Sequence, residues 1–207
     1  MKATRINNGS VRIEASGIRV LVNPTEVEAA DVLIITDVHP THYSMDALTG
    51  ILAASEGSVD ILCSESVYTL ICEKVGERHN PVLLAPHSVW SRAGVTFYSV
   101  KAQNPDQSAI GIILDDGEVT CYFSGATLYN FDVIDDVLDL VENGVDHAFL
   151  PISGRSNNMN PKDAADFAYE IGAKAATPIC YAPGADISEF DFDDAVILEP
   201  GESTNVG

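Results

Sequence analysis

Residues 33–48 read LIITDVHPTHYSMDAL and join an apolar run to a cluster of polar side chains. The apolar run that ends at Ile35 predicts a strand buried on both faces, as in a parallel sheet. Asp37, His39 and His42 follow it within a few positions. Imidazole and carboxylate groups are common ligands of zinc and related metals, so the tip of this strand is a candidate metal site. A hydrogen-bonded polar loop would use the same residues, and this stretch alone leaves both interpretations open.

Strand and helix patterns alternate along the rest of the chain. β-rich runs at 10–14 and 18–22 flank a short Ala-Ser-Gly segment, which predicts a hairpin. A helix is expected at 44–55, with Ser44 as its N-cap. Further strands are predicted at 59–63, 82–84, 95–101, 109–114, 118–123, 146–151, 174–179 and 195–198, and further helices from Ser64, at 131–142 and at 161–171. The last seven residues are expected to fray. Hairpins mixed with helices indicate a single α/β domain, residues 1–207, built from two mixed sheets flanked by helices.

Composition and charge narrow the classes of partner. The chain has 207 residues, of which 46% are hydrophobic, and a formal net charge of −20. Such an acidic surface repels phosphate backbones, so nucleic acid and anionic membranes are poor candidate partners. The N-terminal stretch lacks a signal-peptide pattern, and the longest apolar runs are far shorter than the roughly 20 residues of a membrane span. We therefore expect a cytoplasmic protein.

The four cysteines form no Cys-x-x-Cys pair. Cys63, Cys72 and Cys121 lie in apolar contexts, which predicts core positions and a reducing compartment. Cys180 differs because it follows Thr-Pro-Ile at the end of a predicted strand.

The order of these segments resembles the metallo-β-lactamase superfamily over nearly the whole chain. The stretches that carry the resemblance are NNGSVRIEASGIRVLVNP (7–24), ADVLIITDVHPTHYSMDAL (30–48), AIGIILDDGEVTCYFSGATLYN (109–130) and VDHAFLPISGRSNNMNPKDAADFAYEIGAKAATPICY (145–181). The similarity is greatest to a small lactonase-like branch that includes the ascorbate-phosphate lactonase type. It implies a four-layer αββα sandwich with its site at one edge, between the two sheets, and a homo-oligomer as in relatives of the branch.

The family motif His-x-His-x-Asp-His holds one or two divalent metals, usually zinc, which activate a water molecule. Here the matching positions are Asp37, His39, Thr41 and His42. Two histidines match, and Asp37 replaces the first histidine with another group able to bind a metal. Thr41 stands where the family has the carboxylate that orients water and binds the second metal.

The later motifs of the family are changed further. Ala126 stands where the branch has an aspartate that bridges the two metals, and Cys180 replaces a histidine ligand. Residues 104–108 contain no histidine, although the resemblance implies one there. Arg155, with Gly154 and Asn157, matches a motif beside the site, where the resemblance implies contact with an anionic substrate group.

The sequence therefore favours a metallo-β-lactamase-fold protein with an eroded di-metal site, either non-catalytic or of altered activity, whose Arg155 binds a small anionic molecule. The alternative is a single-metal hydrolase of a lactone, ester or phosphoester, with one zinc-type ion held by some of Asp37, His39, His42 and Cys180. A Cys180 thiolate beside a histidine is a third possibility, because a nearby imidazole lowers the pKa of a thiol. A protein with a purely structural or interaction role is a further class.

Overall fold

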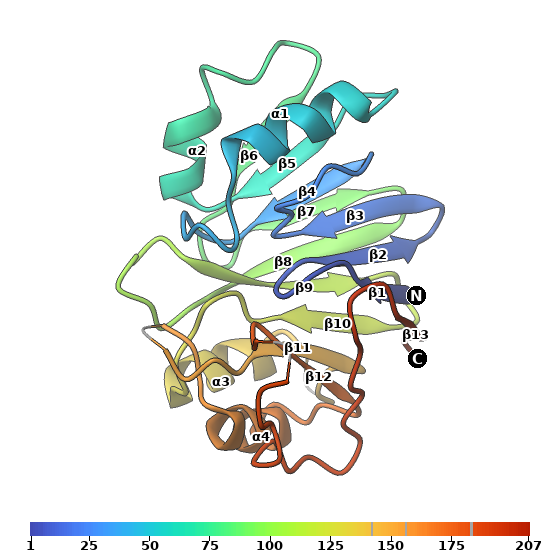
Figure 1. Ribbon diagram of the computed structural model, residues 1–207. Coiled ribbons are helices and arrows are strands. Elements are labelled where there is room, and N and C mark those ends of the chain that lie inside the picture. Colours follow the sequence, from blue (N-terminus) through green and yellow to red (C-terminus); the bar gives the residue numbers. More distant parts are fainter. Residues whose placement is uncertain (142, 156, 183) are drawn as a thin grey trace.

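Two β-sheets lie face to face, and two helices cover the outer face of each sheet (Figure 1). The computed structural model describes residues 1–141, 143–155, 157–182 and 184–207. The seven-stranded sheet has the order β13 (Ser203–Asn205), β1 (Lys2–Arg5), β2 (Val11–Ala15), β3 (Ile18–Val22), β4 (Val32–Ile35), β5 (Asp60–Cys63) and β6 (Asn80–Leu83). The six-stranded sheet has the order β12 (Ala176–Ile179), β11 (His147–Pro151), β10 (Thr120–Phe123), β9 (Ile110–Asp115), β8 (Val95–Lys101) and β7 (Val89–Arg92).

The helices complete the four layers. Helices α1 (Met45–Ala54) and α2 (Glu65–Ile71) cover the first sheet, and α3 (Phe131–Leu138) and α4 (Pro161–Glu170) cover the second. Three buried apolar clusters lie between helices and sheet on either side and between the sheets. This arrangement confirms the predicted αββα sandwich. In the described part of the chain no helix is long and apolar enough to span a bilayer.

Local sequence signals account for the helix starts. The Ser44 side chain accepts a hydrogen bond from the N–H of Ala47 at 3.3 Å, and the Asn160 side chain accepts one from Asp163 at 2.8 Å. Both caps satisfy backbone donors that the first helical turn leaves unpaired. These caps also fix where the preceding loops end, and both loops contribute residues to the site described below.

Parallel strands bring three loops to the same edge of the sandwich. Strands β4 and β5 are parallel in the first sheet, and β10, β11 and β12 are parallel in the second. The loops that follow β4, β11 and β12 therefore begin at the carboxyl ends of buried strands. This is the edge at which open α/β sheets usually place their ligands.

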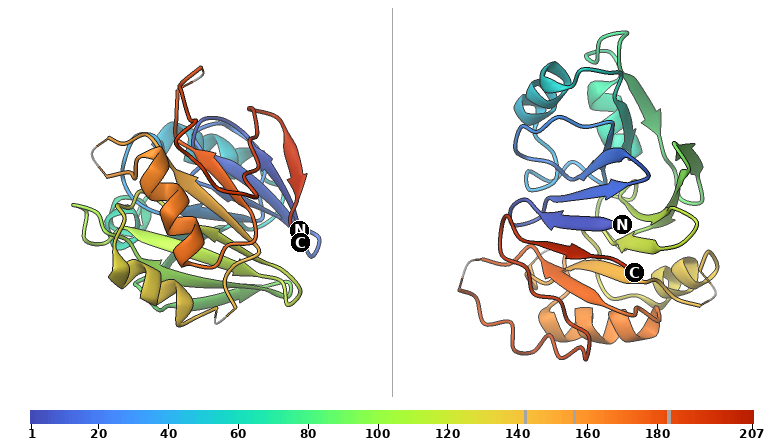
Figure 2. Two further views of the ribbon diagram at one scale, coloured as in Figure 1. Left: turned by 90° about the horizontal axis from the view of Figure 1, so that it is seen from below. Right: turned by 90° about the vertical axis from the view of Figure 1, so that its right-hand side faces the viewer.

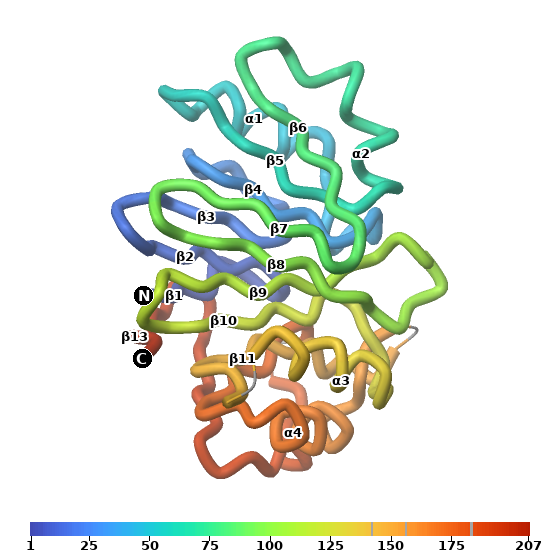
Figure 3. The backbone as a smooth tube through the Cα atoms, turned by 180° about the vertical axis from the view of Figure 1, so that it is seen from behind, coloured from blue at the N-terminus to red at the C-terminus, as the bar shows by residue number. Residues whose placement is uncertain are grey.

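The structure also contains strands that the sequence patterns did not predict. Strands β1, β7 and β13 are additions; the view from behind shows β7 beside β8, at the edge of its sheet (Figure 3). The C-terminal tail does not fray as predicted, because β13 pairs with β1 and Val206 is buried at 3% exposure. The two chain ends consequently lie side by side (Figure 2).

Three other predictions were wrong in part. The strand predicted at 195–198 is reduced to one bridge between Ala176 and Ala195. Two residues further along β12, the backbone of Pro178 faces the same side as that of Ala176. Proline has no N–H group, so the bridge to residue 195 cannot continue there as a strand pair. Helix α3 ends at Leu138, and residue 142, the predicted end, lies outside the described residues. Cys72 is partly exposed near the end of a short helix rather than in the core.

Candidate functional site

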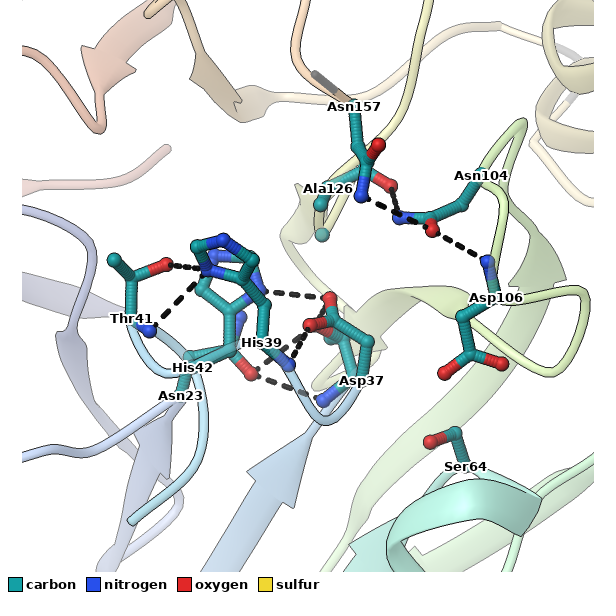
Figure 4. Close-up of polar contacts among 12 residues, drawn as sticks. Asn23, Asp37, His39, Thr41, His42, Ser64, Asn104, Asp106, Ala126 and Asn157 are labelled. Atoms are coloured by element: carbon teal, nitrogen blue, oxygen red, sulfur yellow. Dashed lines mark hydrogen bonds and ion pairs between the residues drawn. The ribbon is translucent and has the colours of Figure 1, made fainter. Parts of the chain in front are cut away.

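The loop after β4 turns back on itself around a buried carboxylate. Asp37 is only 2% exposed, and its Oδ1 accepts the backbone N–H of His39 at 2.8 Å. Its Oδ2 accepts the Thr36 hydroxyl at 3.1 Å and lies 2.7 Å from Nδ1 of His42 (Figure 4). Both carboxylate oxygens are thus occupied by groups of the same loop.

Asp37 and His42 form a buried ion pair. Burial alone would raise the pKa of Asp37, but its hydrogen bond to His42, the charge of His42 and the His39 N–H together hold that pKa below its usual value. Burial likewise opposes charge on His42, but Asp37 and Cys180 raise the pKa of the imidazole to about 10. At neutral pH, His42 is therefore an imidazolium whose Nε2–H points away from Asp37.

His39 and Thr41 form a second, more exposed pair. Nδ1 of His39 lies 2.8 Å from the Thr41 hydroxyl and accepts the Thr41 backbone N–H at 3.3 Å. Nδ1 therefore acts as an acceptor, which places the proton of a neutral His39 on Nε2. The rings of His39 and His42 are 6.1 Å apart and meet edge to face. Thr41 therefore holds His39 through both its side chain and its backbone.

Cys180 approaches this loop from the other sheet. It follows the last residue of β12 with a φ of 60°, and its N–H donates to the carbonyl of Asn8 at 2.7 Å. Its Sγ lies 4.0 Å from Nε2 of His42, and the residue is 8% exposed. A Cβ on Gly9 would lie 3.0 Å from Sγ, so the turn after β1 passes close to the sulfur only because residue 9 has no side chain.

These residues surround a cavity of about 580 Å³ at the edge of the sandwich. It has the size of a small-molecule site. Of the predicted pocket residues, His39, Thr41, His42, Ala126, Arg155 and Cys180 line it, whereas Asp37 lies behind His42. The other described lining residues are Asn8, Gly9, Ile152, Ser153, Asn157, Asn158, Pro161, Tyr181, Ala182, Ala185, Asp186 and Ile187.

The wall opposite the histidines is rich in amides. The Asn104 side chain donates to the carbonyl of Ala126 at 2.8 Å and accepts a 3.4 Å hydrogen bond from Asn157 (Figure 4). Arg155, whose side chain is exposed, enters the cavity wall from the same loop as Asn157. Ala126 itself offers only a methyl group and a carbonyl that is already bonded.

Sequence reasoning missed the contribution of the N-terminal strand. Arg5 is 3% exposed, donates to the Tyr181 hydroxyl at 2.8 Å and to the Leu198 carbonyl at 2.6 Å, and stacks 4.5 Å above the Tyr181 ring. It thereby fixes the segment just after Cys180. The Asn-Gly pair at 8–9 was the available signal, because it marks a tight turn, but nothing local shows what the turn faces.

A family model described as a beta-lactamase superfamily domain matches residues 12–181. The chain belongs to the metallo-β-lactamase-fold superfamily. Solved structures similar to it include a metallo hydrolase from the archaeon Ignicoccus hospitalis, with 16% identity, a TM-score of 0.81, and coverage of 98% of this chain and 97% of that one. The metallo-beta-lactamase fold protein YhfI from Bacillus subtilis has 13% identity, a TM-score of 0.78 and 99% coverage of each chain. An isothiocyanate hydrolase from Delia radicum gut bacteria has 16% identity, a TM-score of 0.77 and 99% coverage of each chain. A search of the curated proteins finds no match.

Proteins of this metallo-β-lactamase fold bind divalent metals such as zinc or iron. The donors at this site do not fit the family's two-metal arrangement. Asp37 and Nδ1 of His42 bond to each other, and Thr41 and Ala126 supply no carboxylate. Among the described residues, no group of three or more His, Cys, Asp or Glu side chains is placed to hold a metal ion.

Proposed function

We propose that this protein uses the cavity of the metallo-β-lactamase fold to bind a small organic anion, such as a carboxylate or phosphate ester, without the two-metal centre of its family. The observation that carries the proposal is the charge of the cavity wall. The chain has 31 acidic residues, yet Asp186 is the one carboxylate among the described lining residues. Arg155 and the His42 imidazolium both line the cavity.

The chemistry of these donors suits an anion. A guanidinium presents paired N–H groups that match the geometry of a carboxylate or phosphate. The amides of Asn157 and Asn158 and the hydroxyl of Ser153 lie beside Arg155 in the cavity wall and provide further polar contacts. The apolar residues Ile152 and Ile187 suit the carbon skeleton of an organic ligand rather than a bare inorganic ion.

Isothermal titration with phosphate, phenyl phosphate, glutarate and a neutral phenyl ester tests the proposal. We expect one or more anions to bind, and Arg155→Ala to weaken that binding at least tenfold, because a charge-assisted hydrogen bond contributes about 1.5–3 kcal/mol. Arg155→Lys keeps the charge and should restore part of the affinity. Lys74→Ala, which removes one exposed cation away from the cavity, is the matched control. Equal affinity in Arg155→Ala and the wild type would overturn the proposal.

Metal analysis of protein purified without chelator tests the proposal that the cavity lacks a two-metal centre. We expect far less than two zinc ions per chain. A content near two, with hydrolysis of esters or lactones, would refute the proposal. A content near one that disappears in both His39→Ala and His42→Ala would instead support a single-metal hydrolase.

A further inference from the structure

Three groups from two distant parts of the chain lie in a row beside the cavity. Asp37 Oδ2 contacts Nδ1 of His42 at 2.7 Å, and Nε2 on the other side of the same ring faces Sγ of Cys180 at 4.0 Å. Cys180 and His42 line the cavity, and Asp37 is buried behind them. A nucleophile, a histidine and a carboxylate that orients the histidine form the arrangement by which unrelated folds perform acyl transfer.

We propose that Cys180 is a nucleophile, that His42 is its proton partner and that Asp37 positions His42, so that the cavity hydrolyses an ester or lactone of a small organic acid. This inference rests on the proposed function for the identity of the acid, because it assigns the anionic part of the substrate to the Arg155 side of the cavity. The proposed roles of Cys180 and His42 do not depend on where the anionic part of the substrate binds.

The backbone at Cys180 supports a reactive role. A non-glycine residue with a φ of 60° is strained, and such strain is concentrated at functional sites. Cys180 directly follows β12, so its side chain stands at the tip of a buried strand. The catalytic serine of α/β-hydrolases occupies a comparable sharp turn at a strand end. In the present protein, the hydrogen bond from the N–H of Cys180 to the carbonyl of Asn8 holds the turn in place.

The other cysteines provide a contrast within the same chain. Cys63 and Cys121 are fully buried in the apolar clusters, and burial raises the pKa of each thiol to about 12, whereas Cys180, in the same cluster as Cys121, is 8% exposed. Neither lines the cavity. Cys180 combines a histidine contact, a cavity and a strained turn. The 4.0 Å separation from His42 is long for a hydrogen bond, and contacts of this kind shorten when substrate binds.

The chemistry balances with groups that the site already holds. The Cys180 thiolate forms a bond to the carbonyl carbon of the ester, and the bond from that carbon to the alcohol oxygen breaks. The departing oxygen takes a proton from the His42 imidazolium, which leaves a thioester and an alcohol. Water then attacks the thioester, its proton passes to His42, and the thiolate leaves. The net reaction is ester plus water to acid plus alcohol.

Alkylation with iodoacetamide, read by peptide mass spectrometry on the full chain, tests the nucleophile. We expect Cys180 to react at least tenfold faster than Cys72, although Cys72 is the more exposed thiol. His42→Gln should slow Cys180 at least tenfold and leave the rate at Cys72 unchanged, with Cys72→Ser as the control for overall labelling. If Cys180 reacts no faster than Cys72 in the wild type, the inference is wrong, and this comparison needs no variant to fold.

Reaction with the ester p-nitrophenyl acetate is the second test, because it measures acylation of Cys180 directly. We expect nitrophenol release and an acetyl adduct on Cys180 in the intact mass, both lost in Cys180→Ser and retained in Cys72→Ser. No adduct and no release would overturn the inference. Stoichiometric zinc that protects Cys180 from alkylation would also overturn it, because a bound metal would occupy the thiolate. Iodoacetamide and p-nitrophenyl acetate are both uncharged. If neither reacts with Cys180, the proposal that the cavity binds an anion is unaffected. If no anion binds, the proposal that Cys180 is a nucleophile is unaffected.

Discussion

Asp37→Asn separates the chemical role of the carboxylate from its structural role. The amide is nearly the same size as the carboxylate, and an oxygen in the place of Oδ1 can still accept the N–H of His39. The position of Oδ2 accepts the Thr36 hydroxyl and contacts His42, so an NH₂ group there loses the bond from Thr36. That NH₂ group would also face Nδ1 of His42, where Asp37 now accepts a proton. His42 would then become neutral with its proton on Nε2, facing Cys180. In that state Nε2 cannot accept a proton from the thiol, and the imidazole offers a thiolate a neutral hydrogen bond in place of an ion pair.

The expected loss of stability in Asp37→Asn follows from the hydrogen bonds that Asp37 makes. Asp37 makes three hydrogen bonds within its loop, at 2.7, 2.8 and 3.1 Å. A hydrogen bond to a charged group contributes about 1.5–3 kcal/mol and a neutral one about 0.5–1.5, so the amide should cost about 1–3 kcal/mol of unfolding free energy. For a chain of this size, the melting temperature should fall by roughly 2–10 °C. The analogous Asp→Asn change in serine proteases, with the wrong histidine tautomer, costs about 10⁴ in kcat, so a loss of about 100-fold in Cys180 labelling is a moderate expectation.

The assay is the iodoacetamide rate at Cys180 between pH 6 and pH 9, with Cys72 in the same sample as reference. The wild-type rate at Cys180 across this range is the reference profile. In Asp37→Asn the rate at Cys180 should fall below that reference across the range, because His42 no longer forms an ion pair with a carboxylate. A folded Asp37→Asn protein with the wild-type rate and pH profile at Cys180 would refute the positioning role. An equal loss of rate at Cys72 would point to partial unfolding instead.

Three further changes test the surroundings. Gly9→Ala places a Cβ 3.0 Å from Sγ of Cys180 and should cost about 1–3 kcal/mol in urea unfolding while slowing Cys180 labelling; wild-type values for both would contradict the tight approach. Arg5→Ala leaves Tyr181 without its donor and should lower stability by about 2–4 kcal/mol in the same assay, so a loss below 0.5 would show that the contact is dispensable. Burial lowers the pKa of His147 from 6.5 to about 4, so the unfolded chain binds a proton that the folded chain excludes, and about 3 kcal/mol of stability should be lost as pH falls from 6.5 to 4. His147→Gln should lose correspondingly less over that range, and parallel pH curves for the two proteins would exclude this residue as the cause.

Local sequence signals predicted the strand, the loop and the helix around residues 33–48. The apolar run became β4, and Ser44 caps α1 as expected. These features depend on residues close together in the chain. The C-terminal strand β13 has the sequence Ser-Thr-Asn, which carries no strand pattern of its own. It forms because β1 offers a free edge far away in the sequence, and composition cannot reveal such an edge.

In the candidate site, too, some features could be predicted from the sequence and others depend on contacts between distant residues. The family resemblance indicated which residues share the cavity, and all but Asp37 line it. It did not indicate how they pair. The contact between His42 and Cys180 spans 138 residues, and the hydrogen bond from Cys180 to Asn8 joins the last strand of one sheet to the first turn of the chain. Pairings of this kind depend on sub-ångström placement of side chains by two separate sheets, which no local pattern contains.

The side chains at positions 37, 42 and 180 complement one another chemically. A neutral histidine at position 37 would form no ion pair with His42, whereas the Asp37 carboxylate carries the opposite charge and lies 2.7 Å from Nδ1 of His42. A histidine at position 180 would compete with His42 for the same protons, whereas a thiol complements it. Asp37, His42 and Cys180 stand in a row beside an open cavity, as the proposed nucleophilic chemistry requires. The comparison of Cys180 with Cys72 in the wild-type protein decides whether this row is reactive.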